Sequence, residues 1–358
     1  MTFDEGRALF PVLEHVAYLN AGTFGPLARP TGEAIADQLR RDLEHGRSGK
    51  PYIEQMQAAR AMLRGLIAAL VGAAPERVAL TYSTTDGCNT VLAGLGLRPD
   101  DEIVTTDAEH FGLAGPVFTS GATVRVARVD GLGPEELLEA IVAEVTARTR
   151  LLAVSHVLWT TGITLDVRAL RERTGVPVLV DGAQSVGAIP VDVDAIDYYT
   201  VSGQKWLCGP DTTGALYIAD LDSLRVARPA YFAQQSFEPG GRYVAREGAQ
   251  RFDSGWLSIA SLAGLATAIG LAPEWRFARV REMVAACREA LASRVHVVTP
   301  PDQSGLVAFR PDDDAEMVAA RLLDEGVVVR NIPGTPLVRA SCGWWTSEDD
   351  VERLVGAL

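Results

Sequence analysis

The chain has 358 residues, which is enough for a sizeable core and for two domains rather than one. Apolar residues make up 47% and charged residues 22%, as in an ordinary soluble globular protein. The net charge of -13 argues against a nucleic-acid partner held by its phosphates, and no apolar run is long enough to span a membrane. We therefore expect neither a nucleic-acid nor a membrane partner.

Cysteine usage and the N-terminus indicate the compartment. The four cysteines, at positions 88, 208, 287 and 342, are scattered without the spacing of a metal site. The first residues lack the basic start and apolar stretch of a signal peptide. We expect reduced thiols, no metal and a cytoplasmic protein.

Apolar periodicity and breaker residues predict alternating strands and helices up to about residue 218. The expected helices cover residues 30–45, 52–71, 134–145 and 167–174, with another that begins at 85 or 86. The expected strands cover residues 77–82, 102–106, 123–127, 150–157, 178–180, 198–201 and 215–218. Repeated strand–helix–strand units favour an α/β fold with a mostly parallel sheet and helices on both faces.

The rest of the chain has a different pattern. Residues 221–253 are rich in Gly, Pro and aromatics, which predicts a long loop near the site or at a subunit contact. A smaller α+β unit follows, with helices expected at 262–271, 273–292, 315–325 and from 347, and strands at 294–298, 305–309, 327–330 and 337–341. We assign residues 18–258 to a large domain, and residues 1–17 and 259–358 to a small one.

Two neighbouring predicted strands end on chemically active side chains. The strand at 178–180 runs into Asp181, and the strand at 198–201 is followed by Ser202 and Lys205. Ligands of open α/β sheets bind beyond the carboxyl ends of the strands, so the acid and the amine face one crevice. That pair suits a cofactor with a basic ring nitrogen and an aldehyde, as in pyridoxal phosphate.

A hydroxyl-rich turn stands at an expected helix start. Ser83, Thr84 and Thr85 follow the strand at 77–82. Free backbone N–H groups and hydroxyls at such a position either bind an anion such as a phosphate or simply cap the helix.

Four ordered motifs carry a family resemblance over nearly the whole chain. They are Thr106–His110, Asp181–Gln184, Ser202–Lys205 and Arg339–Ser341. Together they resemble the class V aminotransferase family of pyridoxal-phosphate enzymes, which has the fold type I architecture. The pattern Ser155–Trp159 is closer to one branch of this family, which contains isopenicillin N epimerase-like enzymes and C–S lyases related to cysteine desulfurases.

The resemblance assigns the cofactor contacts. It implies that Lys205 forms a Schiff base with the cofactor and moves protons, and that Asp181 pairs with the pyridine nitrogen. Gln184 would donate to the 3'-oxygen of the ring, and His110 would lie on the ring face. The resemblance implies that the cofactor phosphate is bound by the backbone of Thr84 and by the side chains of Thr85, Ser202 and Gln204. At the position of Gln204, members of the family often have His.

The resemblance also implies substrate contacts and a second subunit. Arg339 would hold the substrate carboxylate in a bidentate fork, with a surface ion pair as the alternative. Asn20 would contact the substrate, or would only form the turn at residues 18–26. Trp256 replaces the usual threonine of the segment that reaches the phosphate of a partner subunit, so this contact would come from the Ser254 hydroxyl or from a backbone N–H instead. A site shared in this way implies a homodimer.

Two differences from cysteine desulfurases restrict the range of reactions that we expect. The segment 329–339 lacks the loop cysteine of persulfide-forming desulfurases, and Trp159 stands where they have Asn. We expect a C–S or β-eliminating lyase that acts on a small or modified amino acid, with an aminotransferase or an epimerase as the alternative.

Overall fold

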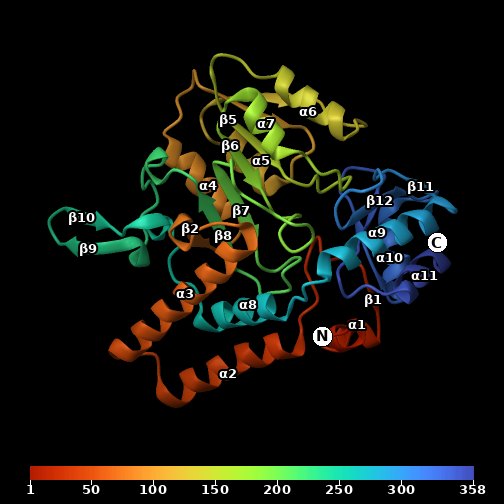
Figure 1. Cartoon of the computed structure of the whole chain (residues 1–358), viewed down its shortest axis with the longest axis horizontal. Coiled ribbons are helices and arrows are strands. Elements are labelled where there is room, and N and C mark those ends of the chain that lie inside the picture. Colours follow the sequence, from red (N-terminus) through yellow and green to blue (C-terminus); the bar gives the residue numbers. More distant parts are fainter.

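A seven-stranded sheet organises the larger part of the molecule in the computed structural model, which describes residues 1–358 (Figure 1). Only β8 runs antiparallel to its neighbours, so the predicted mostly parallel α/β sheet is confirmed. In spatial order the strands are β2 (Val78–Thr81), β8 (Gly214–Ile218), β7 (Tyr198–Ser202), β6 (Val178–Asp181), β5 (Thr149–Ser155), β3 (Glu102–Thr106) and β4 (Thr123–Ala127).

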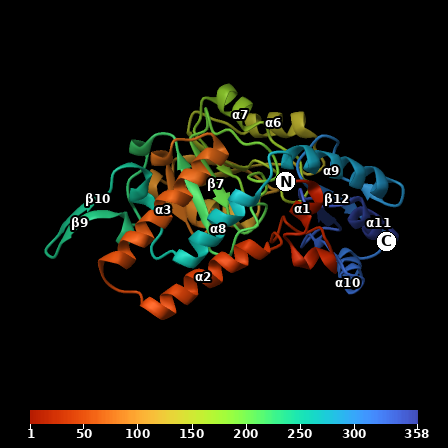
Figure 2. The same ribbon diagram turned by 60° about the horizontal axis from the view of Figure 1, so that its bottom comes forward.

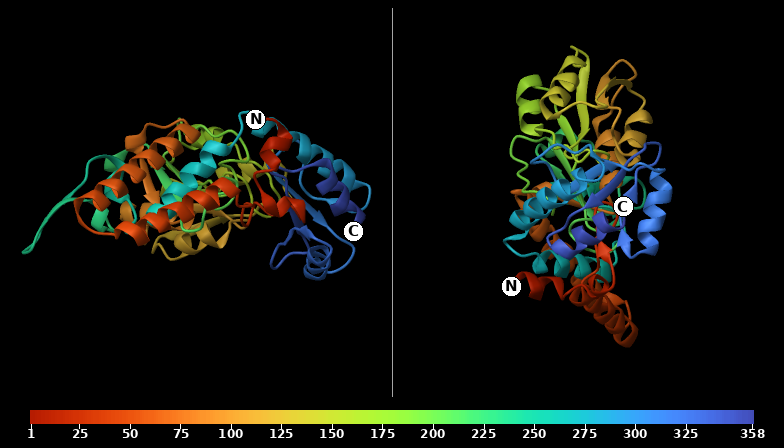
Figure 3. Two further views of the ribbon diagram at one scale, coloured as in Figure 1. Left: turned by 90° about the horizontal axis from the view of Figure 1, so that it is seen from below. Right: turned by 90° about the vertical axis from the view of Figure 1, so that its right-hand side faces the viewer.

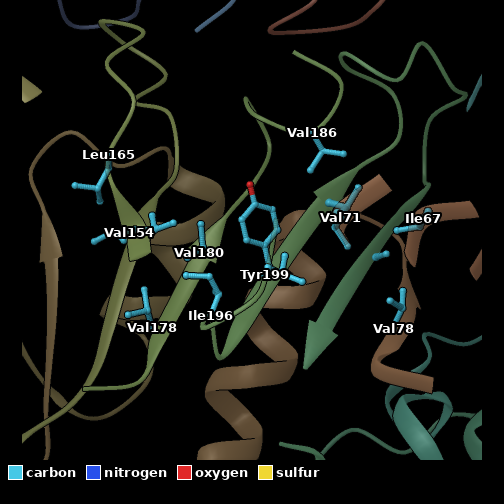
Figure 4. Packing of buried hydrophobic residues seen from close by; sticks show 14 of the residues in the cluster. Ile67, Val71, Val78, Val154, Leu165, Val178, Val180, Val186, Ile196 and Tyr199 are labelled. Atoms are coloured by element: carbon cyan, nitrogen blue, oxygen red, sulfur yellow. The ribbon is translucent and has the colours of Figure 1, made fainter. Parts of the chain in front are cut away.

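The two faces of the sheet bury two separate cores, because side chains alternate across a strand. On β6, Val178 and Val180 lie in one core and Leu179 lies in the other. Figure 4 shows the first core, where Val154, Val178 and Val180 line neighbouring strands beside Tyr199. The side chains of these central strands are almost fully buried, which fixes the strand ends rigidly.

Helices cover both faces of the sheet. The first core receives side chains from α3 (Gly49–Val71), α6 (Pro134–Ala143), α7 (Val167–Thr174) and α8 (Ile259–Leu271). The second core receives them from α4 (Thr84–Leu95) and α5 (Phe111–Phe118). Helix α2 (Arg29–His45) packs along α8 on the outside of this layer (Figure 2).

A smaller α+β unit lies at one end of the elongated molecule (Figure 3). Its antiparallel sheet has the order β11 (His296–Val297), β12 (Leu306–Arg310), β15 (Val338–Ser341) and β14 (Arg330–Asn331). The helices around it are α1 (Phe3–Arg7), α9 (Arg276–Ala292), α10 (Ala315–Asp324) and α11 (Glu348–Gly356). The strands predicted at 294–298 and 305–309 correspond to β11 and β12, which pair with each other in antiparallel orientation.

The N-terminal segment is joined to this smaller unit. Strand β1 (Ala17–Tyr18) pairs in parallel with β13 (Val327–Val328), and Asn20 forms a bridge with Ser341 of β15. The strand predicted at 327–330 is therefore two short strands, β13 and β14, with different partners. Residues 17–20, at the start of the turn-rich N-terminal segment, are therefore held by β13 and β15 of the small unit.

Three features differ from the sequence prediction. Residues 221–253 are not one long loop, because β9 (Gln234–Glu238) and β10 (Arg242–Ala245) form a hairpin that projects from the large unit (Figure 1). The short helices α1 and α5 were not predicted. Helix α8 contributes Leu262 and Leu265 to the large core. The domain division at residue 258 stays a prediction, and this packing favours a boundary after Leu271.

The four cysteines are free thiols, and all four are buried. None of the helices is both long enough and apolar enough to cross a membrane.

Candidate active site

The ends of β6 and β7 bring an acid and an amine to one edge of the sheet. Strand β6 ends at the buried Asp181, and its parallel neighbour β7 ends at Ser202, three residues before Lys205. Burial lowers the pKa of Lys205 to about 8; the carboxylate of Asp181 opposes this shift, and the charge of Arg339 adds to it. Both groups therefore act electrostatically on the same buried amine.

A cavity of about 190 Å³ opens above this edge. It is lined by Gly22, Thr23, His110, Trp159, Gln184, Lys205, Arg330 and Arg339. The lining comes from the N-terminal turn segment, from loops at the edge of the large sheet and from the small sheet. The structure thus brings together four of the predicted site residues in one cavity: His110, Gln184, Lys205 and Arg339.

The carboxylate of Asp181 is oriented by its own loop. Its Oδ1 atom accepts the N–H of Ala183 at 2.9 Å and the hydroxyl of Thr200 at 3.4 Å, whereas Oδ2 has no hydrogen-bond partner within the chain. One acceptor oxygen therefore remains available to a ligand.

The amide of Gln184 is fixed from both sides. Its Nε2 atom donates to the carbonyl of Gly22 at 2.8 Å, and its Oε1 atom accepts the indole N–H of Trp206 at 3.0 Å. Since Nε2 carries two hydrogens, one N–H is left over. That remaining donor suits the role predicted for Gln184 toward a ring oxygen.

His110 caps helix α5 and lies against Trp159. Its Nδ1 atom accepts the N–H of Gly112 at 3.1 Å, so the proton of the neutral ring resides on Nε2. The two rings meet edge to face with centroids 5.0 Å apart. Burial, and then the charge of Lys205, lower the pKa of His110. The imidazole is therefore neutral near pH 7.

Arg339 is a buried guanidinium with an unused donor. Its Nη1 atom donates to the carbonyl of Trp159 at 2.6 Å, while the buried Nε atom has no partner. Burial lowers the pKa of Arg339 to about 9, and the nearby Arg330 acts in the same direction. The approach of the N-terminal segment is close, because a Cβ atom at Gly22 would lie 2.7 Å from Arg339 Nη2.

Arg330 is a cavity residue that sequence reasoning missed. It stands opposite Arg339 in the register of β14 and β15, and it forms no ion pair. An arginine near a strand end has the appearance of a surface residue in the sequence. One feature of the sequence could have indicated its place in the cavity: Arg330 stands nine residues before Arg339, at the end of another strand predicted for the small unit.

Glu109 is a second residue whose role the sequence does not predict, although it lies in the Thr106–His110 motif. Its carboxyl group accepts the hydroxyl of Thr106 at 2.8 Å and both the hydroxyl and the N–H of Ser155. Burial raises the pKa of Glu109 to about 7, and these hydrogen bonds oppose the shift. The residue ties the His110 loop to the end of β5.

His156, the first residue after β5, is hydrogen-bonded to the backbone of Asp181. The N–H of His156 donates to the carbonyl of Asp181 at 3.0 Å, and its Nδ1 atom lies 2.6 Å from the hydroxyl of Tyr199. That hydroxyl also bonds with Ser185. Burial lowers the pKa of His156 to about 4, so the ring stays neutral in this network.

The residues predicted for a phosphate lie around the start of α4. Thr84 and Thr85 form its first turn, which Ser83 caps through a bond to the N–H of Asp86. The hydroxyl of Ser202 donates to Gln204 Oε1 at 2.7 Å. These four residues do not line the 190 Å³ cavity, and their phosphate role stays a prediction.

Two other predicted residues have partners outside the cavity. The hydroxyl of Ser254 donates to the carboxylate of Asp86 in the first turn of α4 of the same chain. Asn20 bridges to the small sheet, and its buried Oδ1 atom has no partner. Neither arrangement tests the contacts predicted for these residues.

Unpaired polar atoms surround the cavity and fit pyridoxal phosphate. Asp181 offers an acceptor for a ring N–H, Gln184 offers a donor for a ring oxygen, and Lys205 offers an amine of lowered pKa for an aldehyde. Arg339 Nε and Trp159 Nε1 are also without partners. The donor set is that of a pyridoxal-phosphate site with room for a carboxylate.

The comparisons with known proteins identify the class of enzyme. A family model described as aminotransferase class-V matches residues 29–354. Isopenicillin N epimerase of Amycolatopsis lactamdurans is 32% identical over 384 residues, which cover 96% of this chain and 94% of that protein. A cysteine desulfurase of Cronobacter sakazakii is 30% identical and covers 98% of this chain; the match spans 96% of that protein.

Solved structures give the same result. Two structures of C-DES, described as a cystine C–S lyase, match with TM-scores of 0.91 and 0.90 at 29% identity. They cover 98% and 97% of this chain and 98% of each C-DES chain. One carries glycine covalently linked to the PLP cofactor, and the other carries the reaction product cysteine persulfide.

The chain belongs to the class-V aminotransferase family, and it is a pyridoxal-phosphate-dependent enzyme of that family. The predicted family, fold type and cofactor are therefore confirmed. The particular reaction, the homodimer, the cytoplasmic location and the roles of single residues stay predictions.

Proposed function

We propose that the protein is a lyase that cleaves a C–S bond of a small or modified amino acid by β-elimination. The observation that supports this proposal most strongly is Lys205. It is the only primary amine in the cavity lining, and its pKa of about 8 lies near neutral pH. The overall reaction would convert a cysteine S-conjugate and water into a thiol, pyruvate and ammonium. Pyridoxal phosphate, when bound, supplies an electron sink for the negative charge that develops at the α-carbon.

The side chains of the cavity would divide the remaining work. Arg339 would hold the α-carboxylate, and its buried position with a free Nε favours a bidentate grip. Lys205 would take the proton from the α-carbon and later supply one to the departing sulfur. Asp181 would hold a positive charge on the ring nitrogen, and Gln184 and His110 would orient the ring.

None of the four cysteines lines the cavity, which disfavours a persulfide carried on the enzyme. Cys342 follows β15 but lies fully buried in the core of the small unit. The likeness to C-DES, which is described as a cystine C–S lyase with cysteine persulfide as its reaction product, supports C–S cleavage in which the sulfur leaves with the product. A second guanidinium in the cavity, that of Arg330, favours a substrate that bears more than one negative charge.

The second candidate function is epimerisation, which the 32% identity to isopenicillin N epimerase favours. Inversion at the α-carbon needs a proton delivered to the face opposite the one that lost it. The other lining residues include one imidazole, that of His110, and burial lowers its pKa below the ordinary value of histidine. A cavity with a single strong base therefore favours elimination over inversion.

The test is to incubate the holoenzyme with cysteine S-conjugates and cystine and to measure pyruvate. The proposal expects one pyruvate for each thiol released from an S-conjugate, and one pyruvate for each cysteine persulfide released from cystine, with the cofactor unchanged at the end. Conversion of the cofactor to its amine form without pyruvate would indicate an aminotransferase instead. Exchange of the α-hydrogen with inversion of configuration and no pyruvate would indicate an epimerase.

A further inference from the structure

A second cavity, of about 210 Å³, shares no lining residue with the active-site cavity and lies at the base of the β9–β10 hairpin. It lies beside α3, which approaches the hairpin in Figures 1 and 2. The polar residues that line it are Gln57, Arg60, Arg64, Arg246, Gln250 and Asp253. Three guanidiniums and a single carboxylate thus share one small space.

The carboxylate of Asp253 is fully used by the buried arginines of α3. Its Oδ2 atom accepts from Arg60 at 3.2 Å and from Arg64 at 2.8 Å. Its Oδ1 atom accepts from Arg64 at 3.1 Å and from the N–H of Leu80 at 2.8 Å. A carboxylate has about four acceptor sites, so Asp253 has none to spare.

Arg246 is therefore left without an acceptor. Its guanidinium forms no hydrogen bond and no ion pair within the chain, and its Nε atom is buried. A buried N–H without a partner is costly, and a guanidinium prefers an oxyanion that it can grip with two donors. The amides of Gln57 and Gln250 also line the cavity without side-chain partners.

The charges point to the same kind of ligand. One carboxylate among three guanidiniums leaves two positive charges unbalanced in the lining. The chain as a whole has a net charge of -13, so this excess is a local property of the cavity. Arg60 and Arg64 lie one turn apart on α3 and are already bridged by the carboxylate of Asp253, whereas Arg246 has no such counter-charge.

We propose that this cavity binds an oxyanion, with Arg246 as the principal unshared donor. The oxyanion is either a free phosphate-like ion or an acidic side chain of a second copy of the chain. The cavity also borders the chain around residue 254, because Arg60 donates to the carbonyls of Ser254 at 2.9 Å and Gly255 at 3.2 Å. Occupancy would therefore stiffen this segment.

The test uses holoenzyme with inorganic phosphate as the probe, by calorimetry at constant ionic strength. Arg246→Gln removes the unpaired charge and no hydrogen bond within the chain. Arg242→Gln is the matched control, because Arg242 is an exposed arginine of the same hairpin whose nearest acid, Glu238, lies 3.7 Å away. Cofactor absorbance verifies that both variants are folded and loaded.

For a free ion, the wild type and Arg242→Gln bind phosphate saturably, and Arg246→Gln binds it at least about tenfold more weakly. For an acidic side chain of a second copy, the wild type takes up no phosphate. Sedimentation then shows self-association that is about tenfold weaker in Arg246→Gln and unchanged in Arg242→Gln. The proposal is overturned if all three proteins bind phosphate equally, or if none binds it and their self-association is the same.

Discussion

Two cavities of similar size, about 190 and 210 Å³, are lined by arginines, yet they differ in what stands beside those arginines. In the first, Arg330 and Arg339 face Lys205, whose pKa is lowered to about 8 by burial. In the second, Arg60 and Arg64 are bound to the carboxylate of Asp253, and the lining contains neither lysine nor histidine.

The presence of Lys205 in the first cavity alone distinguishes the residues that suit anion binding from those that suit catalysis. Guanidiniums stay charged and hold oxyanions, but they are too weakly acidic to exchange protons at neutral pH. A buried amine beside them can take up and release a proton, and a nearby acid can stabilise a charged ring. Both cavities are suited to an anion, and only the first has a base that can act on it.

The largest expected effect is that of Lys205→Ala. We expect turnover to fall by at least about 10⁴-fold, because we propose this side chain as both the cofactor anchor and the base. The borohydride-reducible yellow chromophore should disappear as well, while phosphate binding or self-association through the second cavity should not change. A wild-type protein without this chromophore would contradict the enzyme assignment.

Asp253→Asn tests the second cavity through stability. Removing the carboxylate leaves Arg60 and Arg64 buried without a counter-charge, so the free energy of unfolding should fall by about 3–5 kcal/mol. Urea unfolding of the holoenzyme, followed by circular dichroism, measures this loss. Asp222→Asn is the control, because Asp222 is an exposed acid in an ion pair with Arg251 and should change stability by less than about 0.5 kcal/mol. Equal effects of the two substitutions would show that the buried cluster contributes nothing.

Arg339→Lys distinguishes the arginines of the two cavities. Lysine keeps the charge but loses the planar fork, so kcat/KM should fall by about 100-fold with little change in chromophore. Arg246→Gln should leave kcat/KM unchanged. If Arg339→Lys retained full activity, the substrate carboxylate would have to bind elsewhere.

The smallest expected effect concerns pH. Only a neutral amine captures an aldehyde, and the lowered pKa of Lys205 makes the neutral form dominant above about pH 8. Capture of pyridoxal phosphate by the apoprotein should quicken about tenfold per pH unit below that value and level off above it. Stopped-flow absorbance measures the rate. A rise that continues to pH 10 would mean that Lys205 titrates as an ordinary lysine.

Much of the first cavity was predictable because its residues follow strand ends. Buried apolar runs mark β6 and β7 clearly, and the residues after them necessarily meet at one sheet edge. Helix α5 was missed because it is only eight residues long and contains Pro116. Arg330 was missed because β14 has two residues and no apolar pattern of its own.

The second cavity had no sequence signal. Arg60 and Asp253 are 193 positions apart, and their contact depends on how α3 packs near the end of the hairpin region. An arginine in an amphipathic helix predicts a solvated face, so the burial of Arg60 and Arg64 is a tertiary effect. The absence of a partner for Arg246 can be recognised only when every neighbouring acceptor is known.

The contacts between the N-terminal segment and the small unit have a consequence for the order in which the site forms during protein synthesis. The N–H of Gly22 donates to the hydroxyl of Ser341 at 3.2 Å, across 319 positions of the chain. All seven strands of the large sheet have been translated by Ile218, so that sheet can assemble on the ribosome before the rest exists. The wall with Arg330 and Arg339 is translated later than all seven of these strands. A nascent chain therefore acquires Asp181 and Lys205 before Arg339, the residue proposed to hold the substrate carboxylate.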